Sequence, residues 1–197
     1  MFTVAITGGI ASGKTTVCHA LAKALEAPLL SCDAVVHELY GDSVVLESVA
    51  AEFGNEIIAE NGKLNRQFLG DRVFSNPGRR KWLEDLLHPL VLEKVNSWRH
   101  LQIGRCVLIE VPLLYEVDFP LKRDIDVVVA CSTGTQLSRL QQRDQLDPDQ
   151  ALARIEAQLP IAEKMRRANV VIWNEGSPHA LSRQTRLAAS RISLMFP

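Results

Sequence analysis

The sequence lacks the features that mark several classes of protein. No apolar run approaches the roughly 18 residues that a membrane-spanning helix needs, and no basic segment precedes the apolar residues near the N-terminus. We therefore expect neither a membrane-spanning nor a secreted protein. The net charge is only −1, so no broad surface for nucleic acid is implied. Internal repeats and low-complexity segments are absent from the sequence as well.

Cysteine is scarce, and the four cysteines show neither C-x-x-C spacing nor another metal-ligand pattern. Cys18, Cys106 and Cys131 lie inside apolar runs and are predicted to be buried thiols, whereas Cys32 stands beside Asp33. Free thiols of this kind fit a reducing, cytoplasmic compartment. The remaining composition, 47% hydrophobic and 23% charged residues, is typical of one compact α/β protein.

One stretch near the N-terminus carries a complete phosphate-binding motif. Residues 8–15 fit G-x-x-x-x-G-K-[ST] between an apolar β-rich run and an apolar helical pattern. Glycines let the backbone N–H groups of such a loop face phosphate oxygens, Lys14 can reach the β- and γ-phosphates, and the Thr15 hydroxyl can ligate Mg²⁺. The alternative is an ordinary glycine turn that caps a helix, and the agreement of strand, loop, Lys-Thr pair and helix argues against it. The residues assigned to ATP are Gly9, Ile10, Ala11, Ser12, Gly13, Lys14, Thr15 and Thr16.

Strands and helices alternate along the chain. Apolar runs predict strands at 4–7, 28–31, 106–111, 126–131 and 170–173, with helical patterns between them. This alternation predicts an α/β, three-layer P-loop fold with a doubly wound parallel sheet. Ligands of such sheets bind at the carboxyl ends of the strands.

Two acidic residues stand at predicted strand ends. Asp33 follows the second strand, where it could act as a general base or as a partner of a metal site; alternatively, it caps a helix over 34–40. Glu110 lies near the end of the third strand and could support a Mg²⁺ ion. The alternative for Glu110 is a solvated carboxylate without a specific role.

Residues 42–103 are predicted to be mostly helical. Ser43 and Asn65 are the expected caps of two helices. A further helix is predicted to be interrupted at His88-Pro89, because proline disfavours helical geometry in the residue before it. His88 is therefore either a packed junction residue or a substrate contact.

The helix after the fourth strand begins with Thr133-Gly134-Thr135-Gln136, which matches a capping box and gives Gln136 a structural explanation. Arg139 and Arg143 are four residues apart and share one face of this helix.

A second short helix begins at Asp147-Pro148 and carries Arg154 and Gln158 on one face. Such an arginine-rich helical pair beside a P-loop has two interpretations. It is a mobile lid that closes over triphosphate, or it is a solvated helical hairpin.

Taken together, blocks from Thr7 to Gly176 resemble the dephospho-CoA kinase family. The blocks are T-G-G-I-x-S-G-K-T-T at the P-loop, F-G-x-x-I at 53–57, N-G-K-L-N-R at 61–66, L-E-x-x-x-H-P at 83–89, V-P-L-L-Y-E at 111–116, Q-x-x-R-L-x-x-R at 136–143, R-I-x-x-Q at 154–158 and A-N-V-V-I-x-N-x-G at 168–176. The P-loop alone indicates only a phosphate-binding protein, whereas the H-P, V-P-L-L and Q-x-x-R-L-x-x-R blocks are specific to the family.

The resemblance implies ATP-dependent phosphorylation of the ribose 3′-hydroxyl of dephospho-CoA, the last step of coenzyme A biosynthesis. It implies Mg²⁺ with ATP as co-substrate, and no obligatory protein partner is evident. It also implies three regions within one domain. These are a core at 1–32, 104–135 and 168–197, an acceptor-binding helical region at about 33–103 and a helical lid at about 136–167.

The resemblance also favours a role for individual residues. Asp33 becomes the favoured base, while Lys14, Arg139 and Arg143 stabilise charge on the transferring phosphoryl group. The implied acceptor contacts are Asp33, His88 and Arg66, and Asn174 is assigned to ATP.

The chain departs from the family pattern at three positions. Ser31 replaces the first aspartate of a D-x-D pattern, Glu110 replaces an aspartate before V-P-L-L, and Asn169 replaces an aspartate before the last strand.

Other functions fit the sequence less well. A kinase for a nucleoside monophosphate or a sugar would share the P-loop but not the H-P and V-P-L-L blocks. A GTPase would need an N-K-x-D string, which the sequence does not contain. A nucleotide-gated binding module without turnover is disfavoured by the intact set of Lys14, Thr15 and Asp33.

Overall fold

The computed structural model describes residues 1–197 except 60, 75, 118 and 197, and it describes Phe74 by its backbone only. The described chain falls into two compact units, Met1–Ser31 with Leu101–Pro197 and Cys32–His100. Among the residues described, no helix is both long and apolar enough to cross a membrane.

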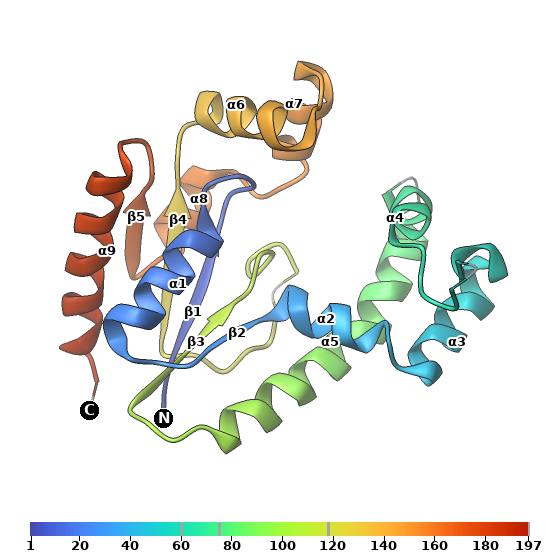
Figure 1. Ribbon diagram of the computed structural model, residues 1–197, viewed down its shortest axis with the longest axis horizontal. Coiled ribbons are helices and arrows are strands. Elements are labelled where there is room, and N and C mark those ends of the chain that lie inside the picture. Colours follow the sequence, from blue (N-terminus) through green and yellow to red (C-terminus); the bar gives the residue numbers. More distant parts are fainter. Residues whose placement is uncertain (60, 75, 118, 197) are drawn as a thin grey trace. The chain divides into compact units, whose positions relative to one another are not determined.

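The first unit is built on a parallel sheet of five strands (Figure 1). The strands are β1 (Phe2–Gly8), β2 (Leu29–Ser31), β3 (Cys106–Glu110), β4 (Ile125–Ala130) and β5 (Val170–Trp173). Their order in the sheet is β2-β3-β1-β4-β5, so the chain winds to one side of β1 and later to the other. This confirms the predicted doubly wound α/β fold.

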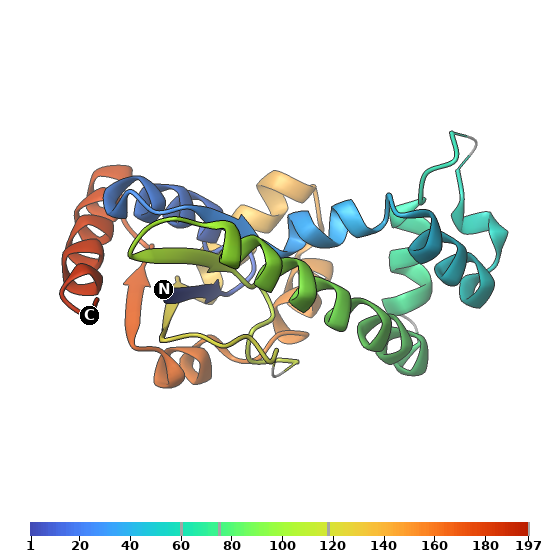
Figure 2. The same ribbon diagram turned by 90° about the horizontal axis from the view of Figure 1, so that it is seen from below.

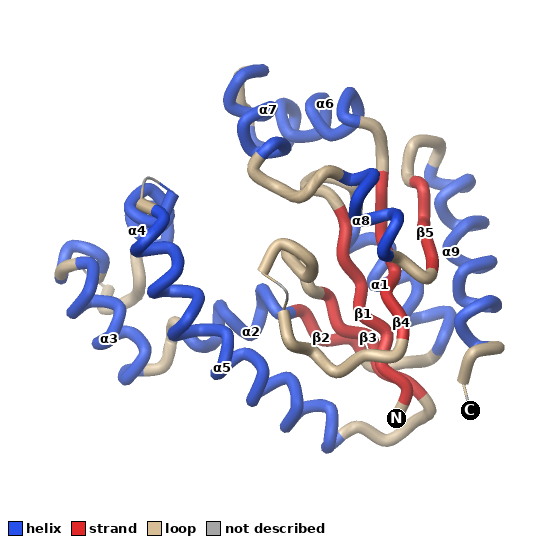
Figure 3. Tube along the Cα trace, turned by 180° about the vertical axis from the view of Figure 1, so that it is seen from behind, coloured by secondary structure: helices blue, strands red, loops and turns tan. Residues whose placement is uncertain are grey.

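Helices α1 (Lys14–Leu25), α8 (Ile161–Arg167) and α9 (Pro178–Ser193) pack against this sheet. The helices α6 (Thr133–Asp144) and α7 (Pro148–Glu156) lie beyond the carboxyl ends of its strands (Figure 1). Seen from behind, α8 lies in front of the sheet, whereas α1 lies beyond it and α9 runs beside β5 (Figure 3). The view from below agrees, with α1 and α8 on opposite sides of the strands (Figure 2). The strands therefore read as nearly continuous apolar runs, because both of their faces are buried.

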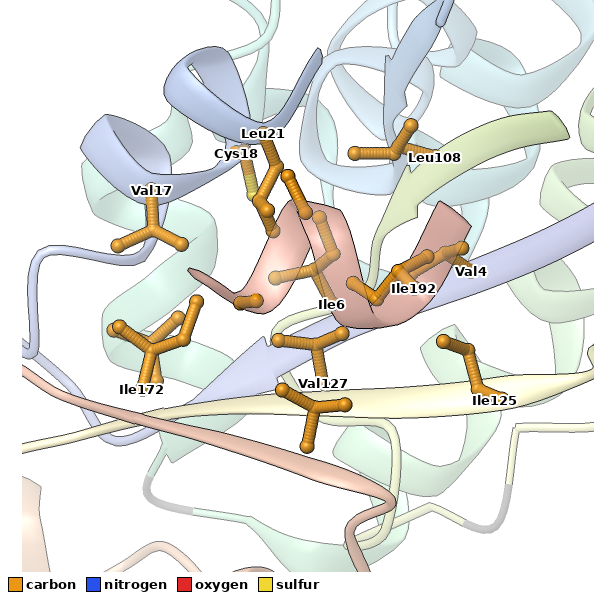
Figure 4. Close-up of a cluster of buried hydrophobic side chains, with 14 of the residues drawn as sticks. Val4, Ile6, Val17, Cys18, Leu21, Leu108, Ile125, Val127, Ile172 and Ile192 are labelled. Carbon is orange, nitrogen blue, oxygen red and sulfur yellow. The ribbon is translucent and has the colours of Figure 1, made fainter. Parts of the chain in front are cut away.

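The main core lies between the sheet and the pair α1 and α9 (Figure 4). Val4 and Ile6, two residues apart on β1, point to this face and meet Leu21 of α1 and Ile192 of α9, all of them fully buried. Burial of one such aliphatic side chain contributes about 1.5–3 kcal/mol. The core thereby fixes the start of α1, and with it the loop that precedes this helix.

Strand register brings two predicted functional segments to one edge of the sheet. Ile6 pairs with Glu110 across β1 and β3, and Gly8 pairs with Val129 across β1 and β4. Because all strands are parallel, the P-loop after β1 and the acidic residue of β3 emerge at the same edge.

The second unit is helical, as predicted. It contains α2 (Cys32–Leu39), α3 (Ser43–Phe53), the 3₁₀ turn η1 (Asn55–Ile57), α4 (Arg66–Phe74) and α5 (Pro77–Leu101), whose last residue belongs to the first unit. Asn65 caps α4, since its side chain accepts a hydrogen bond from the Phe68 N–H at 3.1 Å. The predicted Ser43 cap is wrong, because the Asp42 carboxylate accepts from the backbone of Val44 and Val45 instead.

The predicted break at His88-Pro89 is also wrong, because α5 runs through both residues. Proline at position 89 removes one N–H and so leaves the carbonyl of Asp85 without its helical partner. Asp85 and Pro89 are both exposed, so water can satisfy that carbonyl. Leu87 and Val91 stay buried on either side, and this packing offsets the cost of the proline.

Candidate active site

The P-loop joins the carboxyl end of β1 to the start of α1. Ala11 and Gly13 both have a left-handed backbone, with φ of 55° and 85°. Conformations of this kind turn successive N–H groups toward one point, and α1 adds the positive potential of its N-terminal end there. The loop thus has the backbone of an anion-binding nest.

Lys14, Thr15 and Glu110 form the polar centre beside this loop. The Lys14 Nζ lies 2.9 Å from the Glu110 Oε1, and the Thr15 hydroxyl donates to the same oxygen at 3.2 Å. The Glu110 side chain is only 7% exposed. The alternative of a solvated strand-end carboxylate is therefore wrong for Glu110, which instead holds the two motif side chains together.

Arg139 and Asn174 support the loop from outside. Arg139 donates to the carbonyl oxygens of Ala11 at 3.2 Å and Asn174 at 3.1 Å, and the Asn174 side-chain amide donates to Ser12 O at 2.8 Å. A Cβ on Gly13 would come within 2.4 Å of that amide nitrogen. Gly13 is thus required both by its backbone conformation and by the close approach of Asn174.

Gln136 contacts the P-loop and takes no part in a capping box, so the capping explanation for it is wrong. Ser132 caps α6 by accepting from the Thr135 N–H, which leaves Gln136 free to donate from Nε2 to Ile10 O at 2.7 Å. Gln158 accepts from the Ile10 N–H at 2.8 Å. The sequence placed Gln136 and Gln158 in family-like blocks, but nothing local indicated that both meet Ile10.

Lys164 is a functional candidate that the sequence did not identify. Its side chain is completely buried, and its Nζ lies 2.5 Å from Glu116 Oε1 and 3.1 Å from Gly8 O. Burial lowers the pKa of Lys164, and the hydrogen bond that Lys164 donates to Glu116 opposes this effect. Glu116 Oε1 also accepts from the Leu159 N–H, so this pair ties the segment after α7 to the beginning of the P-loop.

We expect Lys164→Met to destabilise the fold by about 3–5 kcal/mol, because it leaves the Glu116 carboxylate buried without its cation. The second carboxylate oxygen of Glu116 is already buried without a hydrogen bond among the described residues. Chemical denaturation measures the effect. The double variant Lys164→Met, Glu116→Gln should recover much of the lost free energy of unfolding. If it is as unstable as Lys164→Met alone, Lys164 does not stabilise the fold through an ion pair with Glu116.

Glu175, in the turn after β5, binds the first turn of α6 and its cap residue Ser132. Its carboxylate accepts from the Ser132 hydroxyl at 2.6 Å, the Thr135 hydroxyl at 2.5 Å and the Ser132 N–H at 2.7 Å. These hydrogen bonds, those of the two hydroxyls first, lower the pKa of Glu175 to about 2.

The lowered pKa predicts how Glu175 affects stability at different pH values. The ionised carboxylate stabilises the fold fully above the pKa of about 4.3 that glutamate has in unfolded chains, and the contribution is lost as the pH falls through about 2. Glu175→Gln should therefore lower Tm at neutral pH, with a difference from wild type that shrinks toward pH 2. Thermal unfolding across this range measures it, with the exposed Glu93→Gln as control. A difference that does not depend on pH would contradict the assignment.

Arg143 does not lie at the P-loop in this structure. It forms two hydrogen bonds with the neighbouring Asp144, at 2.7 and 2.8 Å, and its side chain is 61% exposed. The hydrogen bond to Asp144 raises the pKa of Arg143. Asp144 also lies 3.6 Å from Arg154 of α7, so it links the two helices. Of the predicted arginine pair, only Arg139 is at the loop.

Asp33, His88 and Arg66 belong to the second unit. Asp33 lies exposed in the first turn of α2, which begins at Cys32, so the alternative in which Asp33 precedes and caps a helix over 34–40 is wrong. His88 lies within α5, and Arg66 opens α4 with its positive charge near the Tyr40 hydroxyl, whose pKa it lowers against the larger effect of burial. Their roles as base and acceptor contacts stay predictions.

Comparison with known proteins identifies the family. A sequence profile described as dephospho-CoA kinase matches residues 2–179. A dephospho-CoA kinase of Nostoc sp. is 38% identical over 187 residues, which cover 94% of this chain and 95% of the relative.

Two solved structures are similar to this chain over nearly its whole length. A Thermus thermophilus protein is 30% identical with a TM-score of 0.82, covering 100% of this chain and 98% of its own. A dephospho-CoA kinase from Campylobacter jejuni is 25% identical with a TM-score of 0.62 and 96% coverage of both chains. The chain therefore belongs to the dephospho-CoA kinase family.

Proposed function

We propose that this protein transfers the γ-phosphoryl group of ATP to the ribose 3′-hydroxyl of dephospho-CoA, completing coenzyme A biosynthesis. The observation that carries the proposal is the family match over residues 2–179, which spans the P-loop and the entire helical unit. A P-loop alone supports phosphate binding, whereas a match across the helical unit also supports the identity of the acceptor. The protein acts in the cytoplasm on two small molecules and needs no protein partner.

ATP binds at the P-loop, with its phosphates on the loop N–H groups and on Lys14. Thr15 and Glu110 would hold Mg²⁺, because a hydroxyl and a carboxylate are the hard oxygen donors that this ion prefers, and both already meet at one point. When bound, Mg²⁺ neutralises charge on the phosphate oxygens. Lys14 is held beside these groups by Glu110 and can turn to the γ-phosphate as the nucleotide enters.

The helical region at about 33–103 binds the acceptor, and Asp33 acts as the base. Asp33 is an exposed carboxylate in the first turn of α2. Asp33 orients the 3′-hydroxyl for in-line attack and accepts its proton, while His88 and Arg66 contribute acceptor contacts. The segment at about 136–167 acts as the lid.

Arg139 and Arg143 stabilise negative charge on the phosphoryl group during transfer. Arg139 already lies at the P-loop, whereas Arg143 must first break its hydrogen bonds to Asp144. We expect Arg143→Ala to lower kcat and kcat/KM together by about 10²-fold or more, with little change in KM for ATP, because the contact forms only in the transition state. Arg143→Lys should stay impaired, since it keeps the charge but loses the planar fork.

Steady-state kinetics measures this effect, with the exposed Arg186→Ala of α9 as a matched control. If KM for ATP rises in Arg143→Ala while kcat holds, this arginine binds nucleotide only. Wild-type kinetics would mean that the helical pair is a solvated hairpin.

ADP formation measured with a panel of acceptors tests the proposed function. Dephospho-CoA should stimulate ATP consumption strongly, while adenosine, AMP and gluconate should leave it near the background rate. Preference for another acceptor on the panel would contradict the proposal.

A further inference from the structure

Two glutamines hold one P-loop residue at both of its backbone polar groups. Gln136 donates to the carbonyl of Ile10 at 2.7 Å, and Gln158 accepts from the N–H of Ile10 at 2.8 Å. These two glutamines stand at opposite ends of the segment that contains α6 and α7. Both ends of this segment are therefore hydrogen-bonded to the backbone of Ile10.

The Gln136 contact is built into the loop. Its side chain is buried, with 3% exposure, and a Cβ on Gly9 would lie 2.6 Å from its amide nitrogen. The absence of a side chain at Gly9 therefore leaves room for the Gln136 amide in its present position. Moving this buried amide away from Ile10 would lower the stability of the fold, because its N–H group would lose a hydrogen bond and find no water to replace it.

The two helices between the glutamines are linked to each other and to the P-loop by side-chain contacts. Asp144 at the end of α6 contacts both Arg143 and Arg154, which binds α6 to α7. Arg139, three residues after Gln136, is fixed to the carbonyl of Ala11. A shift of the loop at Ile10 therefore reaches the whole helical pair.

The peptide group between Ile10 and Ala11 can couple phosphate binding to the Gln136 contact. The carbonyl of Ile10 and the N–H of Ala11 belong to the same peptide group. When phosphate accepts a hydrogen bond from that N–H, the group is polarised and its carbonyl becomes a stronger acceptor for Gln136. By reciprocity, the Gln136 contact makes the Ala11 N–H a better donor to phosphate.

We propose that Gln136 and Gln158 are positioning residues that couple nucleotide occupancy of the P-loop to the position of α6 and α7 through Ile10. The inference rests on the proposed function in that ATP is the nucleotide. Gln136 acts as a donor and Gln158 as an acceptor. Neither touches the reacting atoms, so both act through the loop and through Arg139.

Hydrogen exchange of the backbone amides in 137–157 tests the coupling, with and without a non-hydrolysable ATP analogue and Mg²⁺. In the wild type the analogue should slow exchange about 5–150-fold, the usual range of coupling between sites. Gln136→Leu and Gln158→Leu should each lose most of this protection and also lower kcat. Gln142→Leu, an exposed glutamine of α6, should keep it. Unchanged protection in the two Leu variants, or none in the wild type, would overturn the proposal.

Glutamate variants separate the donor from the acceptor. Gln158→Glu keeps an oxygen for the Ile10 N–H, whereas Gln136→Glu loses the donor to the Ile10 carbonyl. Both variants add the same negative charge near the loop, so charge alone does not distinguish them. Because only Gln158→Glu keeps its hydrogen bond to Ile10, the protection from exchange should be greater in Gln158→Glu than in Gln136→Glu. Equal loss in both would contradict the assigned roles.

Two controls complete the design. If Gln136→Leu does not fold, the half-buried Gln158 tests the same coupling. Because the exchange experiment needs neither acceptor nor turnover, a failure to phosphorylate dephospho-CoA would refute the proposed function and leave this result standing.

Discussion

Lys14→Ala should reduce dephospho-CoA-dependent ATP turnover by more than about 10³-fold, the upper range for loss of one electrostatic donor. Lys14 is the P-loop side chain that follows charge on the β- and γ-phosphates as the phosphoryl group leaves. Its Nζ lies 2.9 Å from a Glu110 carboxylate that is nearly buried, which holds it at the mouth of the nest. The effect should appear in kcat, because the charge that Lys14 stabilises grows during transfer.

The measurement pairs ADP formation with thermal unfolding, since Lys14→Ala also removes the cation beside Glu110. Thr15 still donates to that carboxylate at 3.2 Å, so we expect the variant to fold. Lys23→Ala, an exposed lysine in the last turn of α1, is the matched control. Activity near the wild-type value in folded Lys14→Ala would refute the site.

Asp33→Asn should lower kcat by about 10²–10⁴-fold, the usual loss when a general base is removed. Asparagine keeps the size and hydrogen-bonding capacity of aspartate but is not basic. ATP affinity should change little, because the variant does not alter the P-loop. Steady-state kinetics and ATP binding at equilibrium measure the two quantities separately.

The helix itself should survive this substitution. Asp33 lies in the first turn of α2, where losing a negative charge costs about 0.3–1 kcal/mol against the helix dipole. Asp42→Asn, at the N-cap of α3 in the same unit, is the control, since asparagine caps as well as aspartate. If kcat is unchanged in Asp33→Asn, the Asp33 carboxylate is not the base and only stabilises the start of α2.

The fold was predictable because its signals are local. Near-continuous apolar runs predicted all five parallel strands, and the glycine-lysine pattern predicted a nest between β1 and α1. Pro89 shows the limit of such rules, since packing of Leu87 and Val91 carries α5 through a residue that disfavours helices.

The supports of the P-loop were not predictable in the same way. Glu116 and Lys164 are far apart in the sequence, and neither lies in a pattern that indicates a buried ion pair. The sequence predicted a capping box from Thr133 to Gln136, but the N-cap of α6 is Ser132, one position before Thr133. Contacts of this kind depend on which strands become neighbours, so they emerge only with the sheet order.

The position of the new phosphate in the product tests the central claim most directly. Phosphorus and proton NMR of the product formed from ATP and dephospho-CoA identify the ribose oxygen that carries it. We predict one product, phosphorylated at the 3′-oxygen, in an amount equal to the ADP released. Phosphate at the 2′-oxygen, or ADP released with inorganic phosphate and unchanged acceptor, would contradict the account.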